Sequence, residues 1–213
     1  SGKRHVYADG HEVHFSYGSG PEVLGGRALS VHRGEIVALE GPNGCGKTTL
    51  AKVAAGLLKP SSGTATLNGR ATYLSQDPGR YLVRETAIEE VALGDGGDEV
   101  RAAAALERFG LAFATCRHPR DLSSGERERL GIAAVSVPEP DLLVLDEPTR
   151  GIDPDRKAAL AEWLVEQAVA GVPPHISLAW YRGHDDTDDE ASPAIPVRAG
   201  ERWHFTVRLK RPH

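Results

Sequence analysis

A glycine-rich turn contains the strongest candidates for functional residues. The turn follows a strand-like run at residues 35–40 and precedes a run at 47–58 whose apolar residues recur at helical spacing. Glycines let the backbone curl so that successive N–H groups point inward, and the N-terminus of the following helix adds partial positive charge. A lysine there can reach nucleotide phosphates, and a threonine hydroxyl can ligate Mg²⁺. The predicted phosphate-binding loop reads Gly41-Pro42-Asn43-Gly44-Cys45-Gly46-Lys47-Thr48.

A second group of candidate residues follows a buried strand. Residues 142–145 form an uninterrupted apolar run, which is typical of a strand covered on both faces in a parallel sheet. The run ends in Asp146 and Glu147, and the carboxyl ends of parallel strands meet beside the phosphate-binding turn. Asp146 is suited to hold Mg²⁺, directly or through water, and Glu147 is suited to polarise an attacking water as general base. Together with the turn, the pair predicts a site for phosphoryl chemistry rather than an ordinary loop.

Strand-like and helix-like segments alternate along the sequence around these residues. This alternation predicts an α/β domain with a parallel sheet. Residues 80–118 have a mostly helical pattern with a glycine break at 94–97, which predicts a separate lobe. The other expected elements are short strands and turns at 1–35, strands at 64–67 and 71–75, and helices at 124–137 and 155–170, the last capped by Gly171.

Composition limits the class of protein. A chain of 213 residues, 40% hydrophobic and 26% charged, suits one compact domain with a small inserted lobe. The net charge of -5 gives no basic surface, so no nucleic-acid partner is expected. Two cysteines, Cys45 and Cys116, indicate a reducing compartment without structural disulfides. No apolar run approaches the roughly 18 residues of a membrane span and no signal peptide is visible, so membrane association is expected through a partner.

A third motif gives the chain its family resemblance. Residues 122–126, Leu-Ser-Ser-Gly-Glu, resemble the signature sequence of the ATP-binding cassette (ABC) transporter ATPases. The order Tyr17, phosphate loop, Gln76, signature, acidic pair and Asp153 is also that of this family, over about residues 10–171. Ser124 and Glu126 depart from the usual glycine and glutamine. The resemblance implies an ABC ATPase domain over 1–171, with a RecA-like P-loop NTPase core, an N-terminal antiparallel β subdomain and a small helical lobe at about 78–122.

The family's roles carry over to matching positions. Tyr17 resembles the aromatic that stacks on adenine, and Gln76 resembles the residue that reaches Mg²⁺ and the attacking water. Ser123 and Gly125 would contact the γ-phosphate of ATP held by the other subunit, and Asp153 would link the two sites. The implied catalytic residues are Glu147 and Gln76; the ATP contacts are Tyr17, Asn43, Gly44, Cys45, Gly46, Lys47, Thr48, Thr49, Ser123 and Gly125; the metal ligands are Thr48, Gln76 and Asp146.

Residues 76–82 and 147–153 resemble the ATPase subunits of energy-coupling-factor importers, which take up vitamins or transition-metal ions. The implied cofactors are ATP and Mg²⁺. The implied partners are a second ABC ATPase subunit and an integral membrane transporter subunit, which would hold this cytoplasmic chain on the inner face of the cell membrane. An ATP-gated dimerising module with little or no hydrolysis is the alternative. A soluble ABC ATPase of DNA repair or translation is disfavoured, because no long coiled coil or second cassette is present.

The last part of the chain departs from the family. Counting along the family's pattern places the histidine that contacts the γ-phosphate at Ala179. A strand is expected at 176–181, with His175 before it; His184, just past it, is either the replacement contact or an ordinary surface histidine. An acidic run at 185–190 is typical of a solvated loop. Residues 179–183 with the alternating run 201–210 resemble a segment of bacterial DNA-uptake channel proteins. Residues 172–213 are therefore predicted to be an atypical C-terminal segment, for which a fusion, a reading-frame artefact and a designed chimera are the alternatives.

The cysteine inside the phosphate loop carries a separate hypothesis. A thiol in a phosphate-binding turn before a helix is predicted to be nucleophilic. Alkylation of Cys45 would then block ATP binding, and ATP would protect the thiol. A thiol shielded by packing is the alternative.

Overall fold

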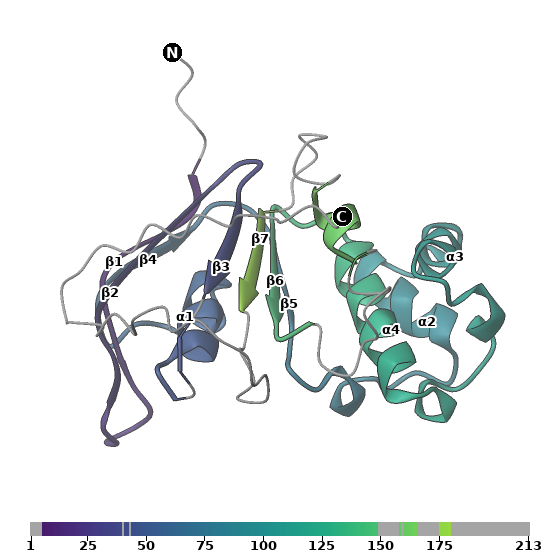
Figure 1. The fold of residues 1–213 in the computed structure, drawn as a ribbon, viewed down its shortest axis with the longest axis horizontal. Coiled ribbons are helices and arrows are strands. Elements are labelled where there is room, and N and C mark those ends of the chain that lie inside the picture. The colour runs from purple at the N-terminus through teal and green to yellow at the C-terminus, as the bar shows by residue number, and fades with distance from the viewer. Residues whose placement is uncertain are drawn as a thin grey trace, which may run out of the picture.

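An antiparallel sheet forms one end of the molecule (Figure 1). In this computed structural model, the described residues are 6–39, 41–42, 44–148, 158, 160–165 and the backbone of 175–179. The sheet has the order β2-β1-β4 and consists of β1 (Val6–Ser16), β2 (Glu22–His32) and β4 (Ser62–Leu67). The sequence predicted only short strands and turns here, which is wrong, because β1 and β2 each run for 11 residues. Register shifts along their pairing interrupt the alternation that would have revealed their length.

A parallel sheet forms the centre of the molecule. Its order is β3-β7-β6-β5, with β3 (Ile36–Leu39), β7 (His175–Ala179), β6 (Leu142–Asp146) and β5 (Ala71–Leu74). All five residues of β6 are buried, as predicted for a strand covered on both faces. His175 begins β7 and pairs with Leu142, so its predicted place before the strand is wrong.

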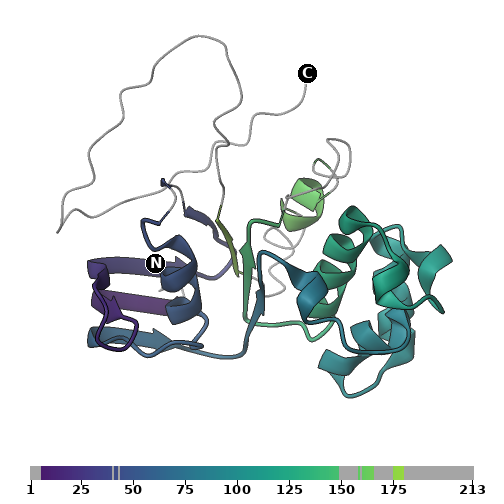
Figure 2. The ribbon, with the colours of Figure 1, turned by 90° about the horizontal axis from the view of Figure 1, so that it is seen from below.

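Helix α1 (Lys47–Ala54) lies between the two sheets (Figure 2). It packs with Ala8 and Val31 of the antiparallel sheet and with Leu142 and Val144 of the parallel sheet. The helix ends earlier than the predicted residue 58. Gly56 has a φ of 72°, a left-handed conformation that ends helices.

The other face of the parallel sheet is covered by helices (Figures 1 and 2). Leu143 and Leu145 face a core that α4 (Ser124–Ser136), α2 (Ala87–Ala92) and α3 (Glu99–Arg108) share. Residues 158 and 160–165 are helical, and Leu160, Trp163 and Leu164 join the same core. Short 3₁₀ segments lie at Pro78–Arg80, Leu93–Asp95, Ala112–Ala114 and Pro119–Asp121. The predicted α/β fold with a parallel sheet, an antiparallel N-terminal sheet and a group of helices is therefore confirmed.

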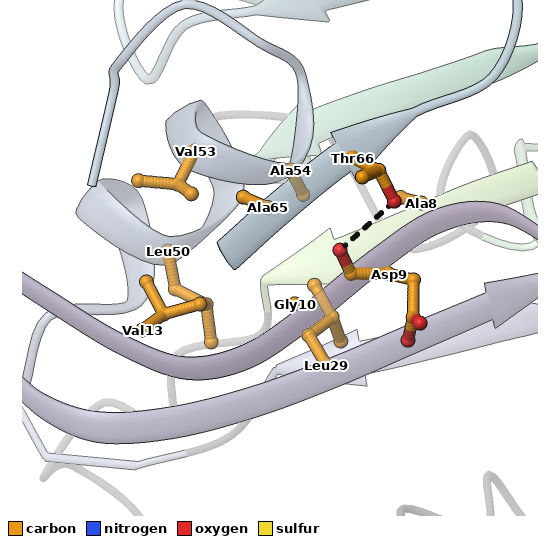
Figure 3. Close-up of a pocket in the computed structure, with 10 residues that line it drawn as sticks. All are labelled: Ala8, Asp9, Gly10, Val13, Leu29, Leu50, Val53, Ala54, Ala65 and Thr66. Atoms are coloured by element: carbon orange, nitrogen blue, oxygen red, sulfur yellow. Dashed lines mark hydrogen bonds between the residues drawn. The ribbon is translucent and has the colours of Figure 1, made fainter. Parts of the chain in front are cut away.

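A small cavity lies where β1, β2 and β4 meet α1 (Figure 3). Its volume of about 10 Å³ is at the lower limit for one water molecule. Apolar side chains such as Val13, Leu29 and Leu50 line it, and the Thr66 hydroxyl at its rim donates to the Asp9 carbonyl. We therefore regard it as a packing gap. Within the described part of the chain, no helix is both long and apolar enough to cross a bilayer.

Candidate functional site

The predicted phosphate-binding loop joins β3 to α1 and is backed by β2. Gly46 caps the helix in a left-handed conformation with a φ of 95°. A Cβ at this position would lie 2.7 Å from Leu24 Cδ2 and 3.1 Å from the Val23 carbonyl oxygen. Both the conformation and the space therefore require glycine at the point where the loop becomes helix.

Lys47 lies inside the curve of this loop. Its Nζ donates to the carbonyl oxygens of Gly41 at 2.8 Å and Pro42 at 3.0 Å. The ammonium group is thus held over the loop by two neutral acceptors, which anionic phosphate oxygens could replace with stronger, charge-assisted bonds. Cys45 also packs into the loop, since a Cβ on Gly41 would lie 2.8 Å from its Sγ. Asn43 lies outside the described residues.

Asp146 brings the carboxyl end of β6 against the start of α1. It is buried, and its Oδ2 accepts hydrogen bonds from Thr48 Oγ1 at 2.9 Å and from Tyr73 Oη at 2.8 Å. Burial and the hydrogen bond to Asp146 raise the pKa of Tyr73 well above its usual range, so the phenol stays protonated and donates. A carboxylate and a hydroxyl group side by side are the hard oxygen ligands that Mg²⁺ prefers.

Glu147 and Gln76 meet at the same edge of the parallel sheet. β5 and β6 are parallel neighbours with Leu74 opposite Leu145, so the residues that follow them emerge together. Gln76 Nε2 donates to Glu147 Oε2. Glu147 has a φ of 53°, a conformation that costs a non-glycine residue about 1–3 kcal/mol and is found repeatedly at functional sites.

Tyr17 lies in the turn after β1, close to the start of α1. Its hydroxyl and Thr49 Oγ1 are 3.2 Å apart, and its ring meets Phe15 edge-on with centroids 4.8 Å apart. Tyr17 is 53% exposed, so part of its aromatic surface is available to a flat ligand. Thr49 itself is buried beside Thr48. The structure therefore brings an aromatic surface to the loop that Lys47 occupies.

Ser123 and Gly125 lie apart from these residues. Ser123 caps α4, where its hydroxyl accepts from the Glu126 N–H while Glu126 Oε2 accepts from the Ser123 N–H at 2.7 Å. The hydrogen bond from the Ser123 N–H lowers the pKa of Glu126, because it stabilises the charged carboxylate. Glu126 thus fills the capping position at which the ABC signature usually has glutamine. α4 covers the face of the parallel sheet opposite to α1 (Figure 2). The signature residues therefore do not join their own chain's phosphate loop.

One residue of this site was missed from the sequence. Tyr73 was assigned to a strand and given no role, although it contacts Asp146. The signal that could have identified it is the pairing of β5 with β6, which the sequence does not display. Asp153 and His184 lie outside the described residues, so the roles predicted for them stay predictions.

Comparisons with known proteins agree on one family. A family profile described as "ABC transporter" matches residues 24–150. The energy-coupling factor transporter ATP-binding protein EcfA of Methanothermobacter thermautotrophicus is 35% identical over 188 residues, which cover 78% of this chain and 60% of that protein. A relative from Clostridium tetani is 32% identical, and the match covers 79% of this chain but only 42% of its length.

Solved structures give the same fold. The structure of cbiO1 from Clostridium perfringens, part of the ABC transporter complex cbiONQ, is 30% identical with a TM-score of 0.69, covering 82% of this chain and 79% of that one. The ATP-binding cassette MJ0796, solved as a dimer in a post-hydrolysis state with ADP and Pi, has a TM-score of 0.73 over 84% of this chain and 88% of that one. At 20% identity the second likeness supports the fold alone.

Proposed function

The chain belongs to the ABC transporter family, and on that premise we propose that it is the ATP-binding and ATP-hydrolysing subunit of an importer of the energy-coupling-factor type. The observation that carries the proposal is that the phosphate loop, Gln76 and the acidic pair meet at one edge of the parallel sheet. Thr48 of the loop contacts Asp146, the last residue of β6, and Gln76 after β5 contacts Glu147. These contacts join residues far apart in sequence around one point, as a phosphate-hydrolysing site requires.

The residues present fit a magnesium-bound nucleotide. Thr48 and Asp146 offer a hydroxyl and a buried carboxylate that already touch, and Gln76 adds an amide oxygen at the same edge. These three residues would hold Mg²⁺. When bound, the metal would neutralise charge on the β- and γ-phosphate oxygens.

Three residues of the chain would have separate roles in hydrolysis. Lys47 would turn from the Gly41 and Pro42 carbonyls to the phosphates, where its charge stabilises the charge developing on the leaving group. Glu147 would take the proton of the attacking water. Gln76, which holds the Glu147 carboxylate, would orient that water beside it.

A second subunit would complete the site. Ser123 and Gly125 lie at the N-terminus of α4, whose N–H groups suit an anion, and α4 lies on the opposite side of the sheet from the loop. This separation supports a head-to-tail dimer, in which each signature contacts ATP bound to the other chain. Tyr17 would stack on the adenine in its own chain.

We also propose that ATP-driven closure of this dimer moves an integral membrane subunit and imports a small nutrient. The named relatives support this, since one is an energy-coupling factor transporter protein and another is part of a transporter complex. The chain would then lie on the cytoplasmic face of the membrane, held there by the partner subunit.

A second candidate function is an ATP-gated dimerising module with little hydrolysis. This function is favoured by Ala179, the last residue of β7. Ala179 pairs with Leu39 of β3 on one side and with Asp146 of β6 on the other. The family pattern places a γ-phosphate-contacting histidine there.

Steady-state ATPase activity, measured beside Glu147→Gln, tests the proposal. Loss of a general base costs about 10²–10⁴-fold in rate, whereas ATP binding by the variant should persist. Wild-type turnover that is no greater than that of the variant would reject the hydrolytic function and favour the gated module. Absence of ATP binding by both proteins would reject both functions.

A further inference from the structure

Tyr73 and Asp146 share one face of the parallel sheet. Tyr73 lies opposite Val144 in the pairing of β5 with β6, and both side chains belong to the core that α1 covers. Side chains alternate along a strand, so Asp146, two residues after Val144, points to the same face. The hydrogen bond of 2.8 Å between the phenol and Asp146 is thus a diagonal contact between neighbouring strands.

One oxygen of Asp146 accepts hydrogen bonds from two hydroxyl groups, one of threonine and one of tyrosine. Thr48 Oγ1 and Tyr73 Oη both donate to Oδ2, at 2.9 Å and 2.8 Å. The Thr48 hydroxyl belongs to the proposed metal site, where its lone pairs would face the cation and its hydrogen bond could change. The phenol of Tyr73 has no such second task. It can therefore hold the buried carboxylate in one orientation whether or not Thr48 moves.

The Tyr73 ring is itself fixed in place. It packs against the apolar cluster that contains Ala51 and Ala54 of α1, and the Lys52 ammonium lies 5.8 Å from the ring centroid. A donor held by packing and by a nearby cation loses little freedom when it forms its hydrogen bond. Such outer partners orient metal ligands, and their loss typically costs about 10–100-fold in metal affinity.

We propose that Tyr73 is a positioning residue that orients Asp146 for Mg²⁺, and so sets how strongly the metal promotes nucleotide binding. The proposal rests on the nucleotide site proposed above. It assigns Tyr73 no contact with nucleotide or metal. Tyr73 acts on metal binding only through the Asp146 carboxylate that it holds.

The test compares nucleotide affinity with and without the metal. The dissociation constant of a fluorescent, non-hydrolysable ATP analogue is measured in excess Mg²⁺ and in EDTA for the wild-type chain, Tyr73→Phe and Tyr81→Phe. The ratio of the two constants is the coupling between metal and nucleotide. Tyr73→Phe keeps the ring and removes only the hydroxyl, while Tyr81, 67% exposed, provides the matched control.

We expect Tyr73→Phe to reduce this ratio about 10-fold, with the constant in EDTA unchanged, and Tyr81→Phe to match the wild type. A purely structural role for Tyr73 would weaken binding equally in both conditions, leave the ratio intact, and overturn the inference. A ratio equal to that of the wild type at unchanged affinity would overturn it too. A wild-type chain that binds no nucleotide in either condition would instead reject the proposed function, and this inference with it.

Discussion

A substitution at Glu90 tests how much helix α2 stabilises the chain segment that follows Gln76. Glu90 is a buried carboxylate on α2, and its Oε2 accepts the backbone N–H groups of Val83 at 2.7 Å and Arg84 at 2.8 Å. Glu90→Ala removes the acceptor of both N–H groups at once. We expect this variant to be markedly less stable than the wild type.

The structure sets the size of the effect. A buried N–H left without an acceptor costs about 1–3 kcal/mol. Val83 is 69% exposed, so water can reach part of this segment, and the lower end of that range applies to each group. The two groups together give about 2 kcal/mol, which for a domain of this size lowers the melting temperature by about 4–8 °C.

Glu90→Gln separates the hydrogen bonds from the rest of the side chain. Its amide oxygen can accept both N–H groups and loses only the benefit of charge, so we expect a loss of about 1 kcal/mol or less. Glu107→Ala, an exposed position on α3, is the matched control and should stay within about 0.5 kcal/mol of the wild type.

Urea unfolding followed by circular dichroism measures all three variants. An unfolding free energy for Glu90→Ala within about 0.5 kcal/mol of the wild type would refute the reasoning. Equal losses for Glu90→Ala and Glu90→Gln would show that the charge, rather than an acceptor at this place, stabilises the segment.

Three further predictions each concern one residue. Asp98 caps α3 by accepting from the N–H groups of Val100 and Arg101, so Asp98→Ala should cost about 1 kcal/mol in thermal melts while Asp98→Asn retains most of it; equal losses would contradict this. The hydrogen bonds at Ser123 lower the pKa of Glu126, so its stabilisation is present at neutral pH and is lost as pH falls through the lowered pKa; the deficit of Glu126→Gln, below about 1 kcal/mol in urea at pH 7, should therefore shrink as the pH is lowered below about 4, and a constant deficit would argue against it. Mg-ATP should slow maleimide labelling of Cys45, mapped by mass spectrometry, and equal labelling with and without it would reject the hypothesis.

The phosphate loop could be predicted from sequence because its requirements are local. Gly46 needs a left-handed backbone, and Lys47 and Thr48 must follow it at once to face the same ligand. All three lie in one short stretch. The same holds for Asp146 and Glu147, since a buried strand delivers them directly to the sheet edge.

The contacts of Tyr73 and Glu90 could not be predicted in this way. Tyr73 and Asp146 are separated by 73 positions and meet only because β5 pairs with β6. The sequence pattern indicates that parallel strands exist, but not which of them are neighbours. Glu90 has the residue type of an exposed helix face, and only the path of the chain before α2 buries its carboxylate.

The predicted bounds of α1 and β7 were wrong because a periodic pattern contains neither the backbone conformation of a glycine nor the pairing between strands. Leu57 and Leu58 continue the apolar pattern of α1, yet Gly56 ends the helix and Leu57 is 58% exposed. His175 was placed before β7, but the pairing with Leu142 extends the strand to include it. The predicted boundary between residues 171 and 172 stays a prediction.

The nucleotide site is tested most simply by equilibrium binding of ATP in the presence of Mg²⁺, measured for the wild type, Lys47→Ala and Lys59→Ala. We expect saturable binding of one ATP per chain and no change for the exposed Lys59→Ala. Lys47→Ala should bind at least about 10-fold more weakly, because a charged hydrogen bond to phosphate is lost. Binding that is absent from the wild type, or equal in all three proteins, would contradict a nucleotide site at residues 41–48.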